Sequence, residues 1–160
     1  MRHWLSPLLW LILAAALQGS LAERMSIGWV KPDFLLVIAV ALSMRGSVEA
    51  AAGIGFVAGL FHSALWNERV AAYTLSRMFA CVVATRVYQA IPAAGPWAAA
   101  VVTGAATLVA GILFLFIGIP SDLLRWLVST VGGILYNAAL ALLVYALQSR
   151  WSSRRSRERI

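Results

Sequence analysis

The stretch WVKPDFLLVIAVALSMRG, residues 29–46, places a lysine, a proline and an aspartate directly before an apolar run, residues 34–42. A membrane core about 30 Å thick needs roughly 20 helical residues to be crossed, so this run is too short to cross alone. Pro32 and Asp33 favour a helix start, because proline there costs no hydrogen bond and aspartate meets the positive end of the helix dipole. We expect a short helix covered by neighbouring protein, with Asp33 satisfied by the helix start or by Lys31. The alternative is that Asp33 only starts a helix in a thinned part of the bilayer.

The rest of the chain is similarly apolar. Of its 160 residues, 62% are hydrophobic and 12% are charged, whereas a soluble domain carries about 25% charged residues. This composition is typical of a membrane protein with several spans, and it leaves no loop long enough to fold as a soluble module. The single cysteine, Cys81, excludes an internal disulfide and a cysteine-based metal site.

Apolar runs and turn residues divide the chain into six predicted spans. The short second one covers residues 32–44, and the others cover residues 4–21, 48–66, 71–91, 97–119 and 123–147. Pro92 and Pro120 lie in the turns on either side of the fifth. The first run could also be read as a cleaved secretory signal, but a retained span is simpler beside so much membrane-like sequence. The expected fold is an all-α membrane protein, a six-span helical bundle with a short second helix, over residues 1–147.

A basic tail, residues 148–160, follows the sixth predicted span. It has one acid, Glu158, and five arginines: Arg150, Arg154, Arg155, Arg157 and Arg159. The positive-inside rule assigns this tail to the cytoplasm, and an even number of spans then puts both termini there. Each basic residue near an anionic leaflet contributes about 1 kcal/mol, so the tail is expected to lie on the inner membrane surface. A contact with a cytoplasmic filament is an alternative use of the same charges.

Small residues follow one another at helical spacing in the third and fifth predicted spans. Gly55 and Gly59 form a GxxxG motif around Phe56, and the fifth span carries Gly104, Gly111 and Gly118. Glycines four apart let two helices approach closely in lipid, where no water drives association. We expect both sets to pack helices within the chain. The alternative is a face that binds a partner.

These motifs together resemble the signature region of the MreD family, small multi-span proteins of the bacterial rod-shape system. The family pattern is a Pro-Asp, an apolar run, a short basic turn and a glycine-spaced helix ending in GF-x-x-G-L. The matching residues are Pro32, Asp33, Arg45, Gly46, Gly55, Phe56, Gly59 and Leu60. The chain departs from the family at His62 and Ser63, where the family often has an aspartate.

The resemblance implies a non-enzymatic scaffold of the cell-wall elongation complex in the bacterial inner membrane. The implied partner is MreC, a single-span protein with a periplasmic coiled coil, and through it MreB, RodA and a class B penicillin-binding protein. Besides these proteins only membrane lipid is an expected contact; no cofactor, metal or nucleic acid is implied. The residues agree, because the only histidines are His3 and His62 and no catalytic constellation can be assembled.

The competing class is a small-molecule carrier, the substrate-binding membrane component of an energy-coupling-factor-type transporter. Such a protein needs polar side chains that converge on a cavity, because polar groups at membrane depth are costly unless used. The candidates are Arg77, Arg86, Tyr88, Tyr136 and Asn137. Nine positions separate Arg77 from Arg86, which is half a turn out of phase, so we expect them to snorkel to opposite interfaces. Asn137 is expected to bond a neighbouring helix.

Overall fold

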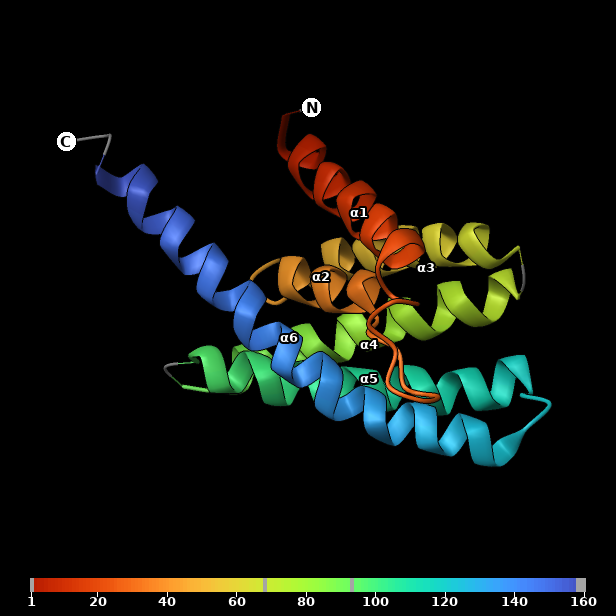
Figure 1. The fold of residues 1–160 in the computed structure, drawn as a ribbon. Coiled ribbons are helices and arrows are strands. Elements are labelled where there is room, and N and C mark those ends of the chain that lie inside the picture. Colours follow the sequence, from red (N-terminus) through yellow and green to blue (C-terminus); the bar gives the residue numbers. More distant parts are fainter. Residues whose placement is uncertain (1, 68, 93, 158–160) are drawn as a thin grey trace.

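The computed structural model describes residues 2–67, 69–92 and 94–157, without side-chain detail for residues 2–4 and 148–157. These described residues form six helices (Figure 1), and the all-α prediction is confirmed. They are α1 (Arg2–Ser20), α2 (Phe34–Ser43), α3 (Val48–Trp66), α4 (Val70–Ala90), α5 (Pro96–Gly118) and α6 (Leu123–Arg157). Their extended structure is limited to one isolated bridge between Ile27 and Val30.

Four of these helices, not the predicted six, are long and apolar enough to cross a membrane. They are α3, α4, α5 and the Leu123–Leu147 part of α6, with 19, 21, 23 and 25 residues. The apolar parts of the other two helices are Leu5–Ser20 and Phe34–Ser43, both shorter than the roughly 20 residues of a crossing. The chain is therefore a multi-pass membrane protein by its four long helices, and the six-span count is corrected.

The short helix α2 lies at the centre of the bundle. It packs against each of the other five helices, and in Figure 1 it occupies only part of the length that α3, α4 and α5 cover. Most of its side chains are buried: Leu35, Leu36, Val37, Ile38, Ala39, Val40 and Ser43. A helix covered on all sides must be apolar all round, which explains why this run shows no polar face. Because α2 is short, it does not fill the whole length of the bundle interior.

The GxxxG motif joins α3 to α4. A Cβ atom placed on Gly55 would lie 2.5 Å from the carbonyl oxygen of Arg77, and one on Gly59 would overlap the backbone of Thr74. Such overlaps mean that the two backbones touch where the glycines lie. Gly53, on the same helix, meets nothing within 4 Å. The predicted internal role of the motif is confirmed.

The glycine stripe of α5 also faces neighbours within the chain. A Cβ on Gly104 would lie 3.3 Å from Ile134, and one on Gly111 would lie 2.5 Å from Thr130, both in α6. At Gly118 the nearest atoms belong to side chains of α5 and α4. The stripe therefore packs α5 against its own chain, chiefly against α6, as expected.

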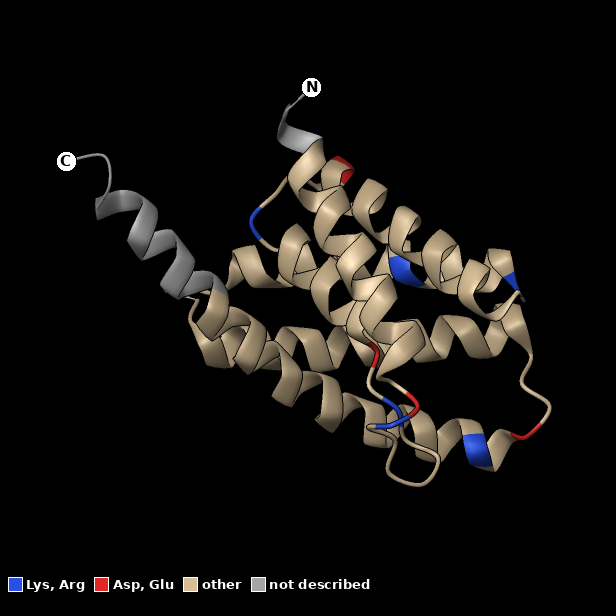
Figure 2. Ribbon diagram, turned by 45° about the horizontal axis from the view of Figure 1, so that its top comes forward, with Lys and Arg blue, Asp and Glu red and all other residues tan. Residues whose placement is uncertain are grey.

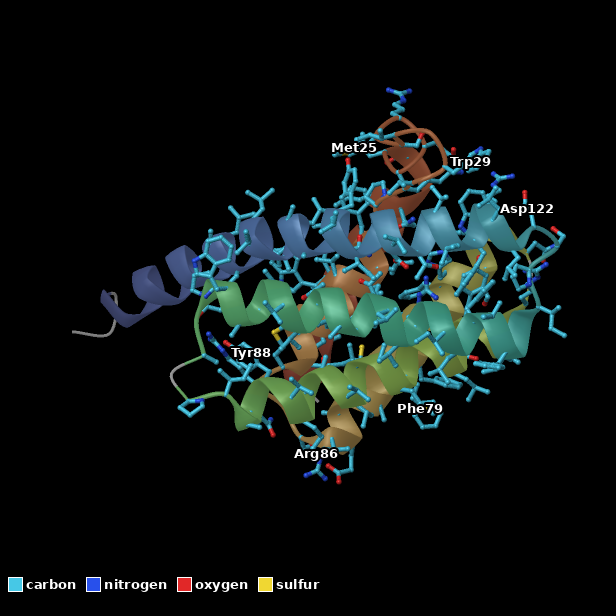
Figure 3. The ribbon with its side chains drawn as sticks, turned by 90° about the horizontal axis from the view of Figure 1, so that it is seen from below. Met25, Trp29, Phe79, Arg86, Tyr88 and Asp122 are labelled. Atoms are coloured by element: carbon cyan, nitrogen blue, oxygen red, sulfur yellow. The ribbon has the colours of Figure 1, made fainter. Side chains whose placement is uncertain are left out.

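The loop between α1 and α2 lies against α6. The hydroxyl of Tyr136 donates to the carbonyl oxygen of Met25 at 3.1 Å, and a Cβ on Gly132 would overlap Val30. Figure 3 shows Met25 and Trp29 on this loop beside α6. The loop is thus folded back onto the bundle and leads the chain into its interior, where α2 starts.

Most described charges gather at helix ends and in the α1–α2 loop (Figure 2). The α6 backbone continues as helix to Arg157, so the predicted boundary between residues 147 and 148 marks the end of the apolar span and not a break in the helix. The side chains of Arg150, Arg154, Arg155 and Arg157 and the whole of Arg159 lie outside the described residues. The sidedness of the tail stays a prediction.

Candidate functional site

Asp33 is the N-cap of α2 and the centre of a polar cluster inside the bundle. One of its carboxylate oxygens, Oδ1, accepts a hydrogen bond from the Leu36 backbone at 2.9 Å. The other, Oδ2, accepts one from the Arg77 guanidinium of α4 at 2.5 Å. The predicted helix-start role is confirmed, but Lys31 is not the partner, because its ammonium pairs with Glu23 at 2.5 Å. Asp33 therefore ties α2 to α4.

Arg77 is buried, with only 5% of its surface exposed, so the prediction that it snorkels to an interface is wrong. Its NH2 group also lies 2.8 Å from Nδ1 of His62, and its guanidinium carbon stands 4.8 Å from the centroid of the Tyr73 ring. The His62 ring stacks on Tyr73 at 4.5 Å. A buried cation is tolerated only when an ion pair and hydrogen bonds compensate it, and these groups supply both.

The Arg77 contact determines the tautomer of His62. A guanidinium can only donate hydrogen bonds, so Nδ1 of His62, 2.8 Å from it, accepts. The same Nδ1 lies 3.6 Å from Asp33, which is too long for a hydrogen bond. In a neutral imidazole the proton then sits on Nε2. His62 therefore presents a donor on the side of its ring away from Arg77.

Gln18 of α1 pairs with the backbone at the start of α2. Its amide nitrogen donates to the Pro32 carbonyl at 3.1 Å, and its amide oxygen accepts from the Phe34 backbone at 2.8 Å. The first turn of any helix leaves backbone N–H groups without partners in the helix. Inside a bundle such groups are costly unless a side chain pairs with them. Gln18 meets this need and fixes α1 against α2.

Asn137 of α6 also pairs with a backbone group at the start of α2. Its amide oxygen accepts from the Asp33 backbone at 3.0 Å, and its amide nitrogen donates to the Thr107 hydroxyl of α5 at 3.2 Å. Only 1% of its surface is exposed. The prediction that Asn137 bonds a neighbouring helix is confirmed, and it joins α2, α5 and α6.

We expect Asn137→Leu to lower the melting temperature of the chain in detergent. The change leaves the Asp33 backbone N–H unpaired, at a cost of about 1–3 kcal/mol for a buried group. It also removes the donor to the Thr107 hydroxyl, which keeps its own hydrogen bond to the Thr103 carbonyl. Leu135, two residues earlier, is 73% exposed, so Leu135→Ala is the matched control and should leave the melting temperature nearly unchanged. Equal melting temperatures for Asn137→Leu and wild type would contradict the role given to this amide.

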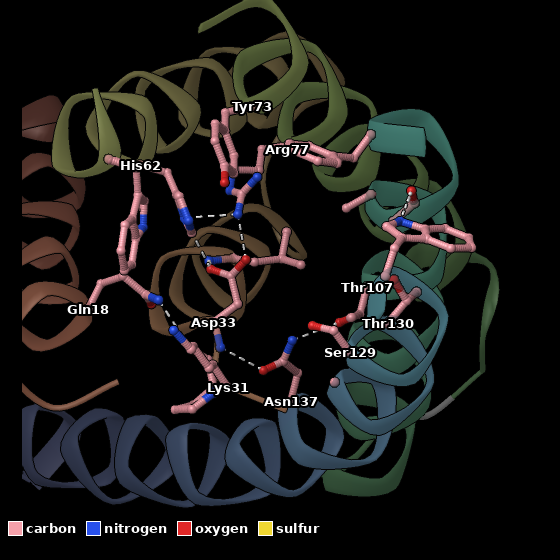
Figure 4. A pocket seen from close by; sticks show the side chains of 18 residues that line it. Gln18, Lys31, Asp33, His62, Tyr73, Arg77, Thr107, Ser129, Thr130 and Asn137 are labelled. Atoms are coloured by element: carbon pink, nitrogen blue, oxygen red, sulfur yellow. Dashed lines mark hydrogen bonds and ion pairs between the residues drawn. The ribbon is translucent and has the colours of Figure 1, made fainter. Parts of the chain in front are cut away.

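A cavity of about 370 Å³ opens beside this cluster (Figure 4). It runs from the start of α2 toward the end of the bundle where α3 ends and α6 begins, because α2 does not fill that part of the interior. Its polar lining includes Lys31, Asp33, His62, Arg77 and Asn137. The volume falls within the 300–1000 Å³ typical of small-molecule sites. All six helices and the loop before α2 contribute residues to it.

The structure brings some of the predicted site residues to this cavity and places others elsewhere. Pro32, Asp33 and Asn137 line it, and so does Arg77. Arg45 lies after the other end of α2, where its guanidinium donates to the Tyr145 hydroxyl at 3.3 Å. Gly55 and Gly59 lie in the α3–α4 contact, and Phe56 is 44% exposed.

Of the residues predicted for a small-molecule carrier, some line the cavity and others lie elsewhere. Arg77 and Asn137 converge on the cavity, whereas Arg86 does not line it, in agreement with the spacing of the two arginines. Tyr88 is buried beside Ala94, to whose carbonyl its hydroxyl donates at 3.3 Å, and Tyr136 bonds the α1–α2 loop. Arg86 points away from the bundle (Figure 3).

Comparison of the chain with models of known families, with curated proteins and with solved structures finds no match. The class is therefore defined by the fold and the site alone. It is a multi-pass, all-helical membrane protein with a buried short helix and a polar cavity at the start of that helix.

Proposed function

We propose that this chain is a non-enzymatic membrane scaffold of the MreD type in the bacterial inner membrane, with both termini in the cytoplasm. In this proposal it binds MreC and links it to the peptidoglycan synthesis machinery, namely MreB, RodA and a class B penicillin-binding protein. The observation that supports it is where the signature residues lie. Pro32 and Asp33 start the central helix, and Gly55 and Gly59 join α3 to α4. If the signature of a family preserves its fold, its residues are expected at helix starts and helix–helix contacts of this kind.

Co-purification tests the proposal. A tagged chain expressed in a rod-shaped bacterium should bring down MreC at a stoichiometric level after mild detergent extraction. Recovery with an ATPase-coupled membrane module, and without MreC, would refute the scaffold and favour a carrier.

We expect Phe56→Ala to reduce MreC recovery at least about tenfold with little change in melting temperature. Phe56 is the one aromatic residue of the signature, and at 44% exposed it is available to a partner helix. Loss of a buried aromatic contact at an interface typically costs about 2 kcal/mol or more, which exceeds a factor of ten.

Phe79→Ala is the matched control for this prediction. Phe79 lies on α4, is 48% exposed and points away from the bundle in Figure 3. Equal MreC recovery for both variants at equal membrane levels would remove Phe56 from the interface.

The arginine tail should determine orientation. Replacing Arg154, Arg155, Arg157 and Arg159 with glutamine removes roughly 1 kcal/mol of surface attraction for each residue. We expect a fraction of the molecules to invert, as measured with a reporter fused to the C-terminus. An outside location of the reporter on the unmodified protein would overturn the assigned sidedness. Filament recruitment by the inside fraction, compared with wild type, tests separately whether the tail contacts MreB.

A carrier of the energy-coupling-factor type is the second candidate. The observation that favours it is the convergence of Arg77 and Asn137 on the cavity, because buried polar groups at membrane depth are expected to have a use. A vitamin-like molecule retained through purification would support this candidate over the scaffold.

A further inference from the structure

The hydrogen-bond acceptors at the floor of the cavity are already occupied. Both carboxylate oxygens of Asp33 accept, one from the α2 backbone and one from Arg77. The amide oxygens of Gln18 and Asn137 accept from backbone groups at the start of α2. A ligand that needs acceptors would find few here.

Donors, by contrast, remain free. The Nε atom of Arg77 is buried without a hydrogen-bond partner among the described residues, and Arg77 is only 5% exposed. The Nε2 proton of His62 follows from its contact with Arg77. Lys31 has three N–H donors and pairs with one carboxylate oxygen of the exposed Glu23. An unpaired buried donor is costly, so an acceptor entering the cavity would stabilise the site.

Electrostatics favour an acceptor that carries negative charge. The Asp33 charge is compensated by Arg77 at 2.5 Å, so it opposes an anion only weakly. The start of α2 points its positive dipole end into the same space, which favours anions. Lys31 adds an ammonium group to the lining, and its counter-ion Glu23 is 51% exposed, so solvent screens this pair more than the buried one.

The rest of the lining is apolar and aromatic. Leu36 and Ala110 are buried there, and Trp66, Phe114 and Trp126 line the part toward the end of the bundle. The cavity thus combines a donor-rich floor with walls suited to hydrocarbon. Its occupant should be polar at one end only.

We propose that this cavity binds a small anionic amphiphile. Its phosphate or carboxylate group would accept from Arg77, His62 and Lys31. Its apolar part would lie against Trp66, Phe114 and Trp126. This inference goes beyond the scaffold function and does not depend on MreC, so the chain purified alone can test it.

The test uses n-octyl phosphate and the full chain in a neutral maltoside detergent. Because Trp66 and Trp126 line the cavity, tryptophan fluorescence reports occupancy, and the melting temperature reports stabilisation. We expect saturable binding with a rise in melting temperature. Octanol and octyltrimethylammonium enter micelles equally well but lack the anion. An equal response to either of them would overturn the proposal.

Two variants locate the site. Lys31→Gln and Thr130→Val change residues of the lining that take no part in the hydrogen bonds between helices. Lys31→Gln should weaken octyl phosphate binding about tenfold, because hydrogen bonds to charged groups contribute more than those between neutral groups. Thr130→Val should have a smaller effect in the same direction. Arg125→Gln removes an equal charge from the exposed first turn of α6, outside the lining, and should bind as wild type does. Equal affinities of all three variants and wild type would overturn the proposal.

Competition distinguishes the sources of the anion. Displacement of octyl phosphate by inorganic phosphate alone would support the anion site and assign it to a free phosphate. Displacement in nanodiscs that contain phosphatidylglycerol, but not in phosphatidylcholine nanodiscs, would assign it to a lipid headgroup. Absence of MreC from the co-purified wild-type chain, with saturable octyl phosphate binding intact, would refute only the scaffold proposal. MreC recovery without octyl phosphate binding would refute only the anion site.

Discussion

Gly59→Leu is expected to lower the free energy of unfolding by about 3 kcal/mol or more, because overpacking costs 1–3 kcal/mol even where side chains can shift. Here the added atoms meet backbone: a Cβ at Gly59 already overlaps Thr74 and the Tyr73 carbonyl of α4. Backbone cannot rotate aside as a side chain does, so α3 and α4 must separate. The loss is measured as a fall in melting temperature in detergent and by unfolding with SDS.

Gly53→Leu is the matched control. Gly53 lies on the same helix, and a Cβ there meets nothing within 4 Å, so the same substitution should change the melting temperature little. Helix propensity favours leucine over glycine by under about 1 kcal/mol, which makes a small rise the expected sign. A similar fall in both variants would show that any large side chain on α3 is harmful and that the close contact with α4 is not the cause.

The central helix could be predicted from sequence because its signals are local. Pro32 and Asp33 set the start of α2, and the unbroken apolar run after them predicts burial on all sides, which the structure has. The GxxxG motif was informative for the same reason, since Gly55 and Gly59 fix which face of α3 can approach another helix. What local signals do not give is the identity of that other helix.

The predicted count of six spans is wrong because hydropathy alone does not distinguish a membrane span from a shorter apolar helix. Residues 4–21 and 32–44 are apolar enough to suggest crossings, but the described apolar helices there are Leu5–Ser20 and Phe34–Ser43. A short helix can be as apolar as a span when protein surrounds it, since protein interior and lipid select the same side chains. At α2 length is the better signal, because its apolar run is shorter than the roughly 20 residues of a crossing.

Arg77 is buried, and does not snorkel, because the helices packed around α4 decide which of its faces is covered. Its phase relative to Arg86 shows that the two do not share a face, but it does not show which face is buried. A better signal was present four residues earlier: Tyr73 and Arg77 lie on one face of α4 at i and i+4, and they form a cation–π contact. The sequence around His62 and Gln18 contains no comparable signal, because the position of a single polar residue on an apolar helix does not indicate which residue it will contact.

Breaking the Asp33–Arg77 pair should have the second large effect. In Arg77→Gln, Asp33 keeps a charge whose side chain is 20% exposed and has lost its counter-ion, and removing one member of a buried pair costs about 3–5 kcal/mol. We expect a fall in melting temperature comparable to that of Gly59→Leu. Arg86→Gln is the control on the same helix: Arg86 is exposed, and its loss should change stability by less than about 0.5 kcal/mol.

The double variant Asp33→Asn with Arg77→Gln separates charge from architecture. Asparagine caps a helix about as well as aspartate, so the start of α2 is retained while neither buried residue is charged. If the ion pair serves to compensate charge, the double variant should recover most of the stability lost in Arg77→Gln, because neutral polar groups are far less costly to bury than an unpaired ion. A double variant as unstable as the single one would instead mean that the guanidinium itself, through His62 and Tyr73, holds α3 and α4 around the start of α2.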